Sequence, residues 1–188
     1  MKIVKRALAV ILIALLAIGI YGCGDNGGVS YEEATKIVKS LMVSANEINR
    51  IHYGVGISHV EKDGDELYAD VDPSERYKSL EDIESFTYKI YTRDLAKSTL
   101  NASFGENEGV VDRTPRYIAV KYQNEVKLLV KKDIEPLNEI YEYDLNEIEI
   151  LGTADGVIEA KIKTTTNKYK KLVFKHEADG WRIDTPTY

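Results

Sequence analysis

The chain has 188 residues and a formal net charge of −6, with 44% hydrophobic and 30% charged residues. This length suits one domain with a short additional segment. The acidic balance argues against nucleic acid as a partner, because nucleic acid requires a basic surface, and against peripheral binding to anionic lipid. The single cysteine excludes an intramolecular disulfide and a cysteine-based zinc site.

Residues 1–22 have the pattern of a secretory signal. Lys2, Lys5 and Arg6 precede an apolar run at residues 7–20. This run is too short to cross a bilayer comfortably, since a spanning helix needs about 20 residues. A basic start followed by a short apolar stretch and a small residue is typical of a segment that is removed from the mature protein.

The residues around Cys23 resemble the bacterial lipobox. Ile20 is aliphatic, Gly22 is small, and the cysteine follows directly, although Tyr21 is bulkier than usual. We predict cleavage after Gly22 and a lipid on the Cys23 thiol, which would anchor the protein to the cell membrane on the side away from the cytoplasm. An ordinary signal peptide with a stray cysteine, or an uncleaved anchor, is the alternative. Loss of residues 1–22 would take the net charge from −6 to −9, because three basic residues leave.

Helical patterns dominate the first half of the domain. Residues 23–29 form the lipidated cysteine and a short tether, and one domain follows over 30–188. Ser30 and Glu33 indicate a capping box for a helix to about Ile51, which Gly54 and Gly56 end. A hairpin is predicted over 56–71. A second helical region covers 79–104, with a cap at Ser79 and Asp82 and a separate helix after Thr92.

The second half of the chain has the pattern of antiparallel strands. The strands are predicted at 116–122, 126–131, 145–151, 157–163, 169–175 and 181–184, with Asp-Gly turns at two of the joints. We therefore expect an α+β fold in which N-terminal helices pack on a C-terminal antiparallel β-sheet meander. The apolar residues expected to face inward are Ile118, Val120, Leu128, Val130, Ile148, Ile150, Ile158, Ile162 and Val173.

No motif for catalysis or metal binding emerges from the polar residues. His52, His59 and His176 have no zinc spacing, and we interpret them as isolated, partly exposed side chains. The acidic residues 61–75 fail the EF-hand spacing, which favours a solvated acidic hairpin over a calcium site. We therefore expect no catalytic residue, no metal and no cofactor.

The connection 132–144 stands out because tyrosines lie among its acidic residues. Tyrosine is frequent in this chain, with 13 residues, and it is enriched at recognition surfaces. Most tyrosines are expected to pack against the sheet. In this connection, however, we predict a displayed partner-binding loop formed by Tyr141, Tyr143, Glu139, Glu142 and Asp144.

Four short segments resemble a known family. They are YKSLEDI at 77–83, YTRDLA at 91–96, PRYI at 115–118 and DGWRIDTP at 179–186. Their order is similar to that of the DL-endopeptidase inhibitor family of the IseA type, over about residues 31–188, with a nuclear transport factor 2-like or cystatin-like shape. The resemblance implies an α+β domain that blocks cell-wall cysteine peptidases by occupying the cleft in which they cut peptidoglycan stem peptides.

Three functions follow from these patterns. The first is a non-enzymatic binding module at the cell surface, most specifically a peptidase inhibitor with a protruding acidic and aromatic loop. The alternative is a nuclear transport factor 2-like small-ligand-binding or enzymatic domain, which requires a pocket enclosed by a concave sheet. The third is a structural lipoprotein subunit without a ligand. The apolar inward faces of the strands favour a filled core.

Overall fold

The computed structural model describes residues 28–60, 67–104, 115–122, 125–134, 136 and 141–188. Its elements form an α+β fold, as predicted. The predicted signal segment 1–22, the cleavage site at Gly22 and the lipidation site Cys23 lie outside the described residues. None of the helices within the described ranges is both long and apolar enough to cross a membrane.

The described helices begin close to the positions that the sequence predicts. They are α2 (Tyr31–His52), α3 (Leu80–Ile90) and α4 (Arg93–Phe104). At the start of α2, Ser30 Oγ accepts a hydrogen bond from the Glu33 amide at 3.2 Å. At α3, the Asp82 amide donates to Ser79 Oγ and the Ser79 amide donates back to Asp82 Oδ2, both at 3.0 Å. These bonds satisfy backbone amides that have no partner inside the helix.

The strands form two antiparallel sheets. The strands are β1 (His59–Val60), β2 (Tyr68–Val71), β3 (Tyr117–Tyr122), β4 (Glu125–Lys131), β5 (Tyr143–Ala154), β6 (Val157–Thr164), β7 (Tyr169–Glu177) and β8 (Gly180–Ile183). The small sheet has the order β1-β2-β4-β3, and the large sheet has the order β5-β6-β7-β8. The predicted C-terminal antiparallel meander is confirmed in β5–β8. Strands β3 and β4 belong to the other sheet, because β2 pairs with β4.

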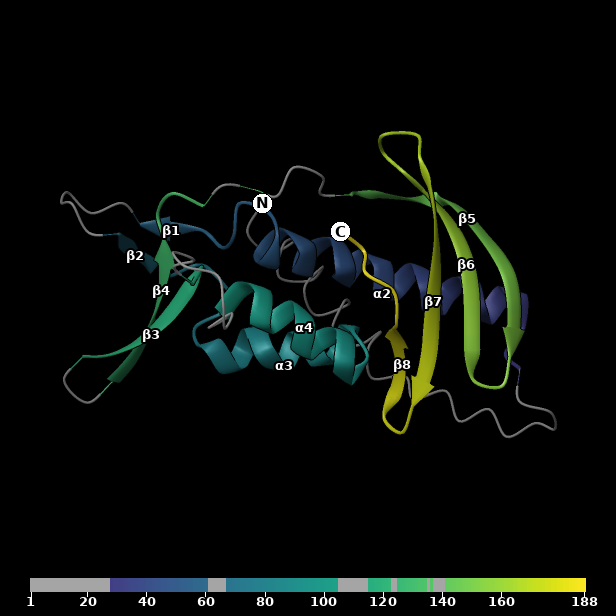
Figure 1. Ribbon diagram of the computed structural model, residues 1–188, viewed down its shortest axis with the longest axis horizontal. Helices are drawn as coiled ribbons and strands as arrows, with labels where there is room; N and C mark the ends of the chain where they lie inside the picture. Colours follow the sequence, from purple (N-terminus) through teal and green to yellow (C-terminus); the bar gives the residue numbers. More distant parts are fainter. Residues whose placement is uncertain (1–27, 61–66, 105–114, 123–124, 135, 137–140) are drawn as a thin grey trace, which may run out of the picture.

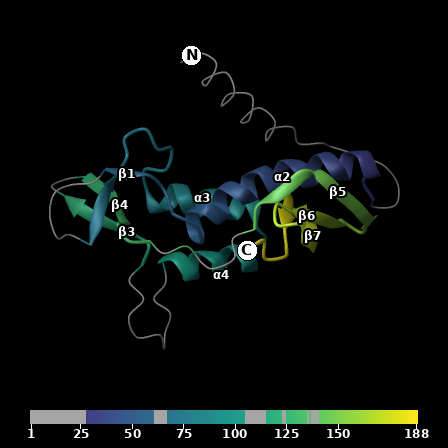
Figure 2. The same cartoon turned by 90° about the horizontal axis from the view of Figure 1, so that it is seen from above.

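The two sheets lie at opposite ends of the helical layer (Figure 1). Helix α2 starts beside β5 of the large sheet and runs along the molecule toward the small sheet (Figure 2). Helix α3 contacts both β8 and β3, and therefore touches a strand of each sheet. One hydrophobic core runs through all these contacts, from Val130 in the small sheet to Phe174 in the large one.

The inward faces of two strands differ from the prediction. In β3, Tyr117 is buried and Val120 is 39% exposed, whereas Val120 was expected to face inward. In β7, Leu172 and Phe174 are fully buried, although Val173 was expected in their place. A shift of one residue sends every side chain of a strand to the other face. The larger aromatic rings of Tyr117 and Phe174 take the core positions.

A buried polar cluster at the last turn of α2 joins three distant segments. Asn49 is fully buried, and its Nδ2 donates to the carbonyl of Thr187 at 3.0 Å. Its Oδ1 accepts from the Tyr91 hydroxyl at 2.8 Å and from the Thr187 hydroxyl at 3.0 Å. The Tyr143 hydroxyl also donates to the Thr187 carbonyl, at 3.1 Å. The cluster thus joins α2 to Tyr91 at the end of α3, to the first residue of β5 and to the segment that follows β8.

Replacing Asn49 by Ala should reduce the free energy of unfolding by about 3 kcal/mol, because it leaves the Tyr91 and Thr187 groups buried with fewer partners. Urea unfolding followed by circular dichroism measures this loss. Asn46→Ala is the matched control on the same helix. The buried Oδ1 of Asn46 has no hydrogen-bond partner among the described residues, so its removal should cost less than about 1 kcal/mol. Equal losses in the two variants would contradict the role of the cluster.

Candidate interaction surface at the small sheet

The C-terminal end of α2 is joined to the small sheet by side chains that donate to carbonyl groups in its last turn and just after it. Arg116 Nη1 donates to the Gly54 carbonyl at 2.6 Å, and the Tyr117 hydroxyl donates to the Ile51 carbonyl at 2.7 Å. A cation at this position is also favoured by the helix dipole. Both donors lie at the start of β3, so this strand and the end of α2 hold each other in place.

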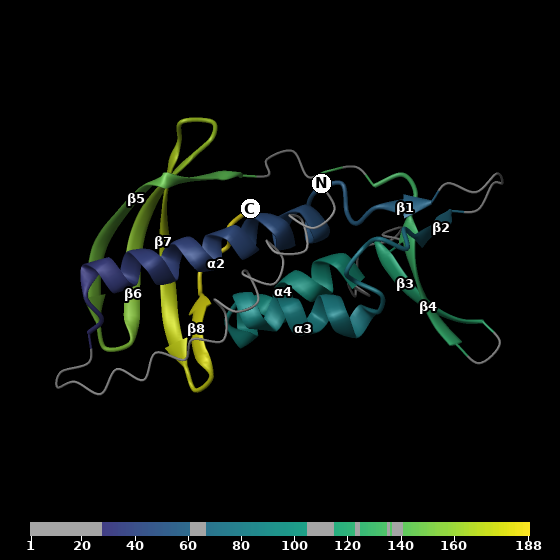
Figure 3. The same cartoon turned by 180° about the vertical axis from the view of Figure 1, so that it is seen from behind.

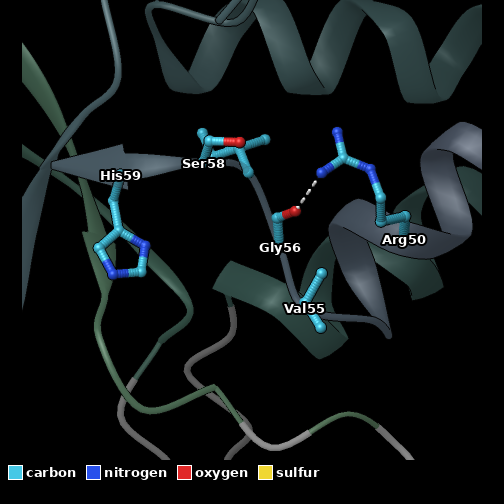
Figure 4. Close-up of a pocket in the computed structure, with 6 residues that line it drawn as sticks. Arg50, Val55, Gly56, Ser58 and His59 are labelled. Atoms are coloured by element: carbon cyan, nitrogen blue, oxygen red, sulfur yellow. Dashed lines mark hydrogen bonds between the residues drawn. The ribbon is translucent and has the colours of Figure 1, made fainter.

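A surface pocket of about 450 Å³ lies where the chain leaves α2 and enters β1. Arg50 Nη1 donates to the Gly56 carbonyl at 2.7 Å across its wall (Figure 4). Gly56 has a φ of +81°, and an added Cβ would lie 3.0 Å from the Tyr117 hydroxyl, so this turn requires glycine. The pocket is lined by Arg50, Val55, Gly56, Ile57, Ser58 and His59.

Glu75 fixes the far side of this turn. Its Oε1 accepts a hydrogen bond from the Ser58 amide at 2.8 Å. Burial alone would raise the pKa of Glu75, but the Ser58 hydrogen bonds and the charge of Arg50 together lower it. The ionised carboxylate therefore supports a turn that presents Arg50 and His59 on opposite sides of the chain (Figure 4). Such a turn can receive a polar group of a partner.

The distal half of the β3–β4 hairpin is exposed on both faces. Val120 pairs with Lys127, and Lys121 pairs with Val126, so the two valines lie on opposite faces. Val120 is 39% exposed and Val126 is 64% exposed. The hairpin extends away from the helices at one end of the molecule (Figure 3). An isolated two-stranded hairpin is at best marginally stable in water, so this segment is suited to contact with a partner.

The outer face of the small sheet continues the apolar surface of the hairpin. Val60 is opposite Asp70, Asp70 is opposite Leu129, and Leu129 is opposite Ile118, which places these four in one row. Val60 is 41% exposed, and Ile118 and Leu129 are partly exposed. We use the name outer face for Val60, Ile118, Val120 and Leu129.

The predicted display of Tyr141 and Tyr143 on a loop is wrong. Both side chains belong to the hydrophobic core, with 9% and 4% exposure. Tyr143 is the first residue of β5, and burial raises the pKa of its hydroxyl. Lys170 Nζ lies 4.0 Å from the centroid of the Tyr141 ring. Aromatic area is stabilising in the core, and the length of this connection gave no information about which way the rings point.

Of the acidic residues predicted for the same loop, the structure describes Glu142 and Asp144, whose surroundings differ. Glu142 is exposed, and its carbonyl accepts a hydrogen bond from the Thr165 amide at 2.8 Å. Asp144 is partly buried, and its Oδ1 accepts from the Asn146 amide at 3.0 Å. Glu139 lies outside the described residues. The structure therefore does not display the two tyrosines among these acidic residues. The sequence reasoning missed the outer face because it placed Ile118 and Val120 in the core.

The three histidines have three different environments. His52 is buried, contrary to the prediction; its Nδ1 lies 2.7 Å from Ser103 Oγ and its Nε2 lies 2.8 Å from Thr87 Oγ1. Burial, with a smaller contribution from the charge of Arg116, lowers the pKa of His52 to about 3. His59 lines the pocket, and His176 packs edge-on against Trp181. No group of three His, Cys, Asp or Glu residues in the described part of the chain could hold a metal ion.

Comparison of the chain with protein-family models, with curated proteins and with solved structures gave no match.

The buried His52 makes the stability of the fold dependent on pH. The unfolded chain takes up a proton near the ordinary pKa of about 6.5, whereas the folded ring stays neutral until about pH 3. The unfolded state therefore binds more protons in this window. The contribution of His52 to stability is complete above pH 6.5 and is lost as the pH falls, by up to about 1.4 kcal/mol per pH unit.

His52→Gln removes this titration. Its free energy of unfolding should be lower than that of the parent protein at pH 7, and the difference should shrink by about 2 kcal/mol at pH 5. Urea unfolding at both pH values gives the two differences. His176→Gln, the same substitution at an exposed side chain, is the control. If the difference in free energy of unfolding between His52→Gln and the parent protein stays constant with pH, the titration of His52 does not cause the pH dependence.

Proposed function

We propose that the protein is an extracytoplasmic lipoprotein, anchored to the membrane through Cys23, whose domain is a non-enzymatic binding module that inhibits a cell-wall DL-endopeptidase. The anchor is supported by the basic start, the apolar run and the lipobox-like residues that end at Cys23. The target class is supported by the family resemblance of the segments at 77–83, 91–96, 115–118 and 179–186.

The observation that carries the proposal is the β3–β4 hairpin, whose distal half is exposed on both faces. A narrow element with a valine on each face can enter a cleft and contact both walls at once. Exposed apolar surface on such an element contributes to binding when water is excluded by the partner. The adjoining outer face would then lie against the rim of the cleft.

The position of β3 adds a second way of contacting a peptidase. Strand β3 is the last strand in the order of the small sheet, and β4 is on its other side. A peptidase that cleaves extended peptides holds them with backbone hydrogen bonds, and an edge strand offers the same groups. The acidic balance of the domain would favour approach to a basic partner and would make association dependent on salt.

The alternative of a small-ligand-binding domain is less well supported. That fold requires a pocket inside the concave face of a sheet. The inward residues of the large sheet are instead fully buried in the common core, including Ile158, Ile162 and Leu172. The pocket at Arg50 and His59 lies at the turn between α2 and β1, next to the small sheet, where it can add polar contacts to a protein interface.

The test is capture and inhibition of a peptidase. The full-length protein, immobilised in uncharged detergent micelles, is exposed to the cell-wall hydrolases of its own organism at low and moderate salt. We expect salt-sensitive capture of a DL-endopeptidase together with loss of its activity. Failure to capture any peptidase at either salt concentration would contradict the proposal.

Charged substitutions on the hairpin test the contact surface. Val120→Asp and Val126→Asp should each weaken capture about tenfold or more, because each places a charge in an apolar contact. Val43→Asp on α2 is the matched control, since Val43 has the same 39% exposure as Val120 and lies far from the hairpin along the chain. Circular dichroism verifies that all three variants are folded. Equal capture by the hairpin variants and the control would exclude the hairpin as the contact.

A further inference from the structure

The basic residues of this acidic protein are concentrated in the β6–β7 hairpin. Residues 160–176 contain six lysines and no aspartate or glutamate. Because the whole chain has a net charge of −6, the remaining residues sum to −12. The net charge therefore conceals a local region of opposite sign. The six residues are Lys161, Lys163, Lys168, Lys170, Lys171 and Lys175.

The strand register places several of these lysines on one face of the large sheet. In β6, the side chains at 158, 160 and 162 are buried, so Lys161 and Lys163 point away from the core. Lys171 lies directly opposite Lys161, and Tyr169 lies opposite Lys163. Lysines on one face of a strand follow each other at about 6.6 Å. The result is a row of cations beside an aromatic ring that is 53% exposed.

This arrangement is unfavourable for folding when it is considered alone. Like charges directly opposite each other on neighbouring strands are destabilising. Carboxylates on adjacent strands offset part of this cost: Lys161 lies 3.5 Å from Glu149, and Lys171 lies 2.9 Å from Glu159. The two lysine side chains remain 43% and 56% exposed, and exposed ion pairs contribute little stability. A polyanion can therefore replace these carboxylates as the partner of the lysines at small cost.

The end of the hairpin adds further cationic and aromatic surface. Thr164 Oγ1 accepts from the Lys168 amide at 3.1 Å, and Asn167 adopts a φ of +61°. In Figure 1 this turn lies at the top of the large sheet, whereas the β5–β6 and β7–β8 turns lie at the bottom. Lys161 Nζ lies 4.7 Å from the centroid of the Tyr169 ring, so the exposed aromatic side chain is part of the same cationic surface.

The place where the chain enters the domain, at Gly28, favours a polymer over the bilayer as the partner. Gly28 lies beside the Thr153 carbonyl, near the β5–β6 turn, whereas the β6–β7 turn is at the opposite end of β6. The eight residues of β6 span about 26 Å. With the proposed lipid on Cys23, five residues reach at most about 18 Å from the membrane to Gly28. The lysine end would then face away from the bilayer.

We propose that the β6–β7 hairpin is a binding surface for a linear, phosphate-rich polyanion of the cell envelope. The partner is defined by charge complementarity: successive phosphates of an extended chain would lie along the row of Lys163, Lys161 and Lys171, with Lys168 at the turn. The proposal is independent of peptidase inhibition, and only its preference for a polymer over a bilayer depends on the proposed anchor.

The experiment uses inorganic polyphosphate as the probe and the full-length protein in uncharged detergent micelles. Calorimetric titration at several salt concentrations should give a linear decrease of log K with log salt. Three or four lysine–phosphate contacts correspond to a slope of about −3. Lys163→Gln and Lys171→Gln should each weaken binding and make the slope smaller by about 1. Lys36→Gln, at an exposed lysine on α2, is the control and should change neither quantity.

Lysine footprinting with an amine-reactive reagent separates a polymer from a lipid surface. Polyphosphate should protect Lys163, Lys168 and Lys171 but not Lys36, while micelles that contain phosphatidylglycerol should leave all four reactive. The proposal is overturned by absence of polyphosphate binding, by slopes that the hairpin variants share with the parent protein, or by protection from phosphatidylglycerol alone. Because no peptidase is present, none of these outcomes bears on inhibition.

Discussion

The side-chain amide of Asn49 is the interaction that holds the large sheet against the helices, and the other contacts of the fold are arranged around it. It is fully buried in the last turn of α2, where it bonds the Tyr91 hydroxyl together with the hydroxyl and carbonyl of Thr187. Tyr91 is also bridged to Ile183 of β8, so the cluster positions the last strand of the large sheet against the helices. Buried polar groups are costly when they are unpaired, and only one placement of these segments pairs all of them. The small sheet is held by the hydrogen bonds that Arg116 and Tyr117 donate at the end of α2. One sheet is thus fixed at each end of the helical layer.

This arrangement gives the two ends of the molecule different chemistry. The small sheet presents apolar side chains on its outer face and on a hairpin that extends beyond the core, and the pocket at the end of α2 adds polar groups beside them. The large sheet presents a lysine-rich hairpin in a chain that is acidic elsewhere. Apolar surface suits a protein partner and a row of cations suits a polyanion, so the two proposals use separate surfaces. An inhibitor that is held in the cell envelope by a polymer would meet its peptidase where the substrate is located.

A chain with a negative net charge can bind a polyanion through a local group of lysines, because electrostatic interactions are short-ranged at physiological salt. Interactions between exposed charges are largely screened beyond about 8 Å. A net charge therefore describes long-range steering, whereas binding is decided by the charges within one Debye length of the partner. The sequence reasoning used the net charge to argue against nucleic acid and against anionic lipid as partners. That argument holds for the acidic remainder of the chain, and it does not extend to residues 160–176, where the strand register brings lysines of β6 and β7 side by side.

The helices and strands of this protein follow from its sequence, because the signals that define them are local. Ser79 with Asp82 begins a helix, and Asp155-Gly156 adopts the two positive φ angles of a tight hairpin turn. Hydrophobic periodicity located α2, α3, α4 and the described strands to within a few residues. Tertiary contacts set which strands share a sheet, which face of β3 and β7 points inward, and where Tyr141, Tyr143 and His52 lie. These properties depend on contacts between residues far apart in the chain: β2 takes the place beside β4, and Tyr143 and Thr187 meet in the core. Local patterns carry no information about such partners. The outer face and the lysine row are therefore defined by the strand register of the folded chain.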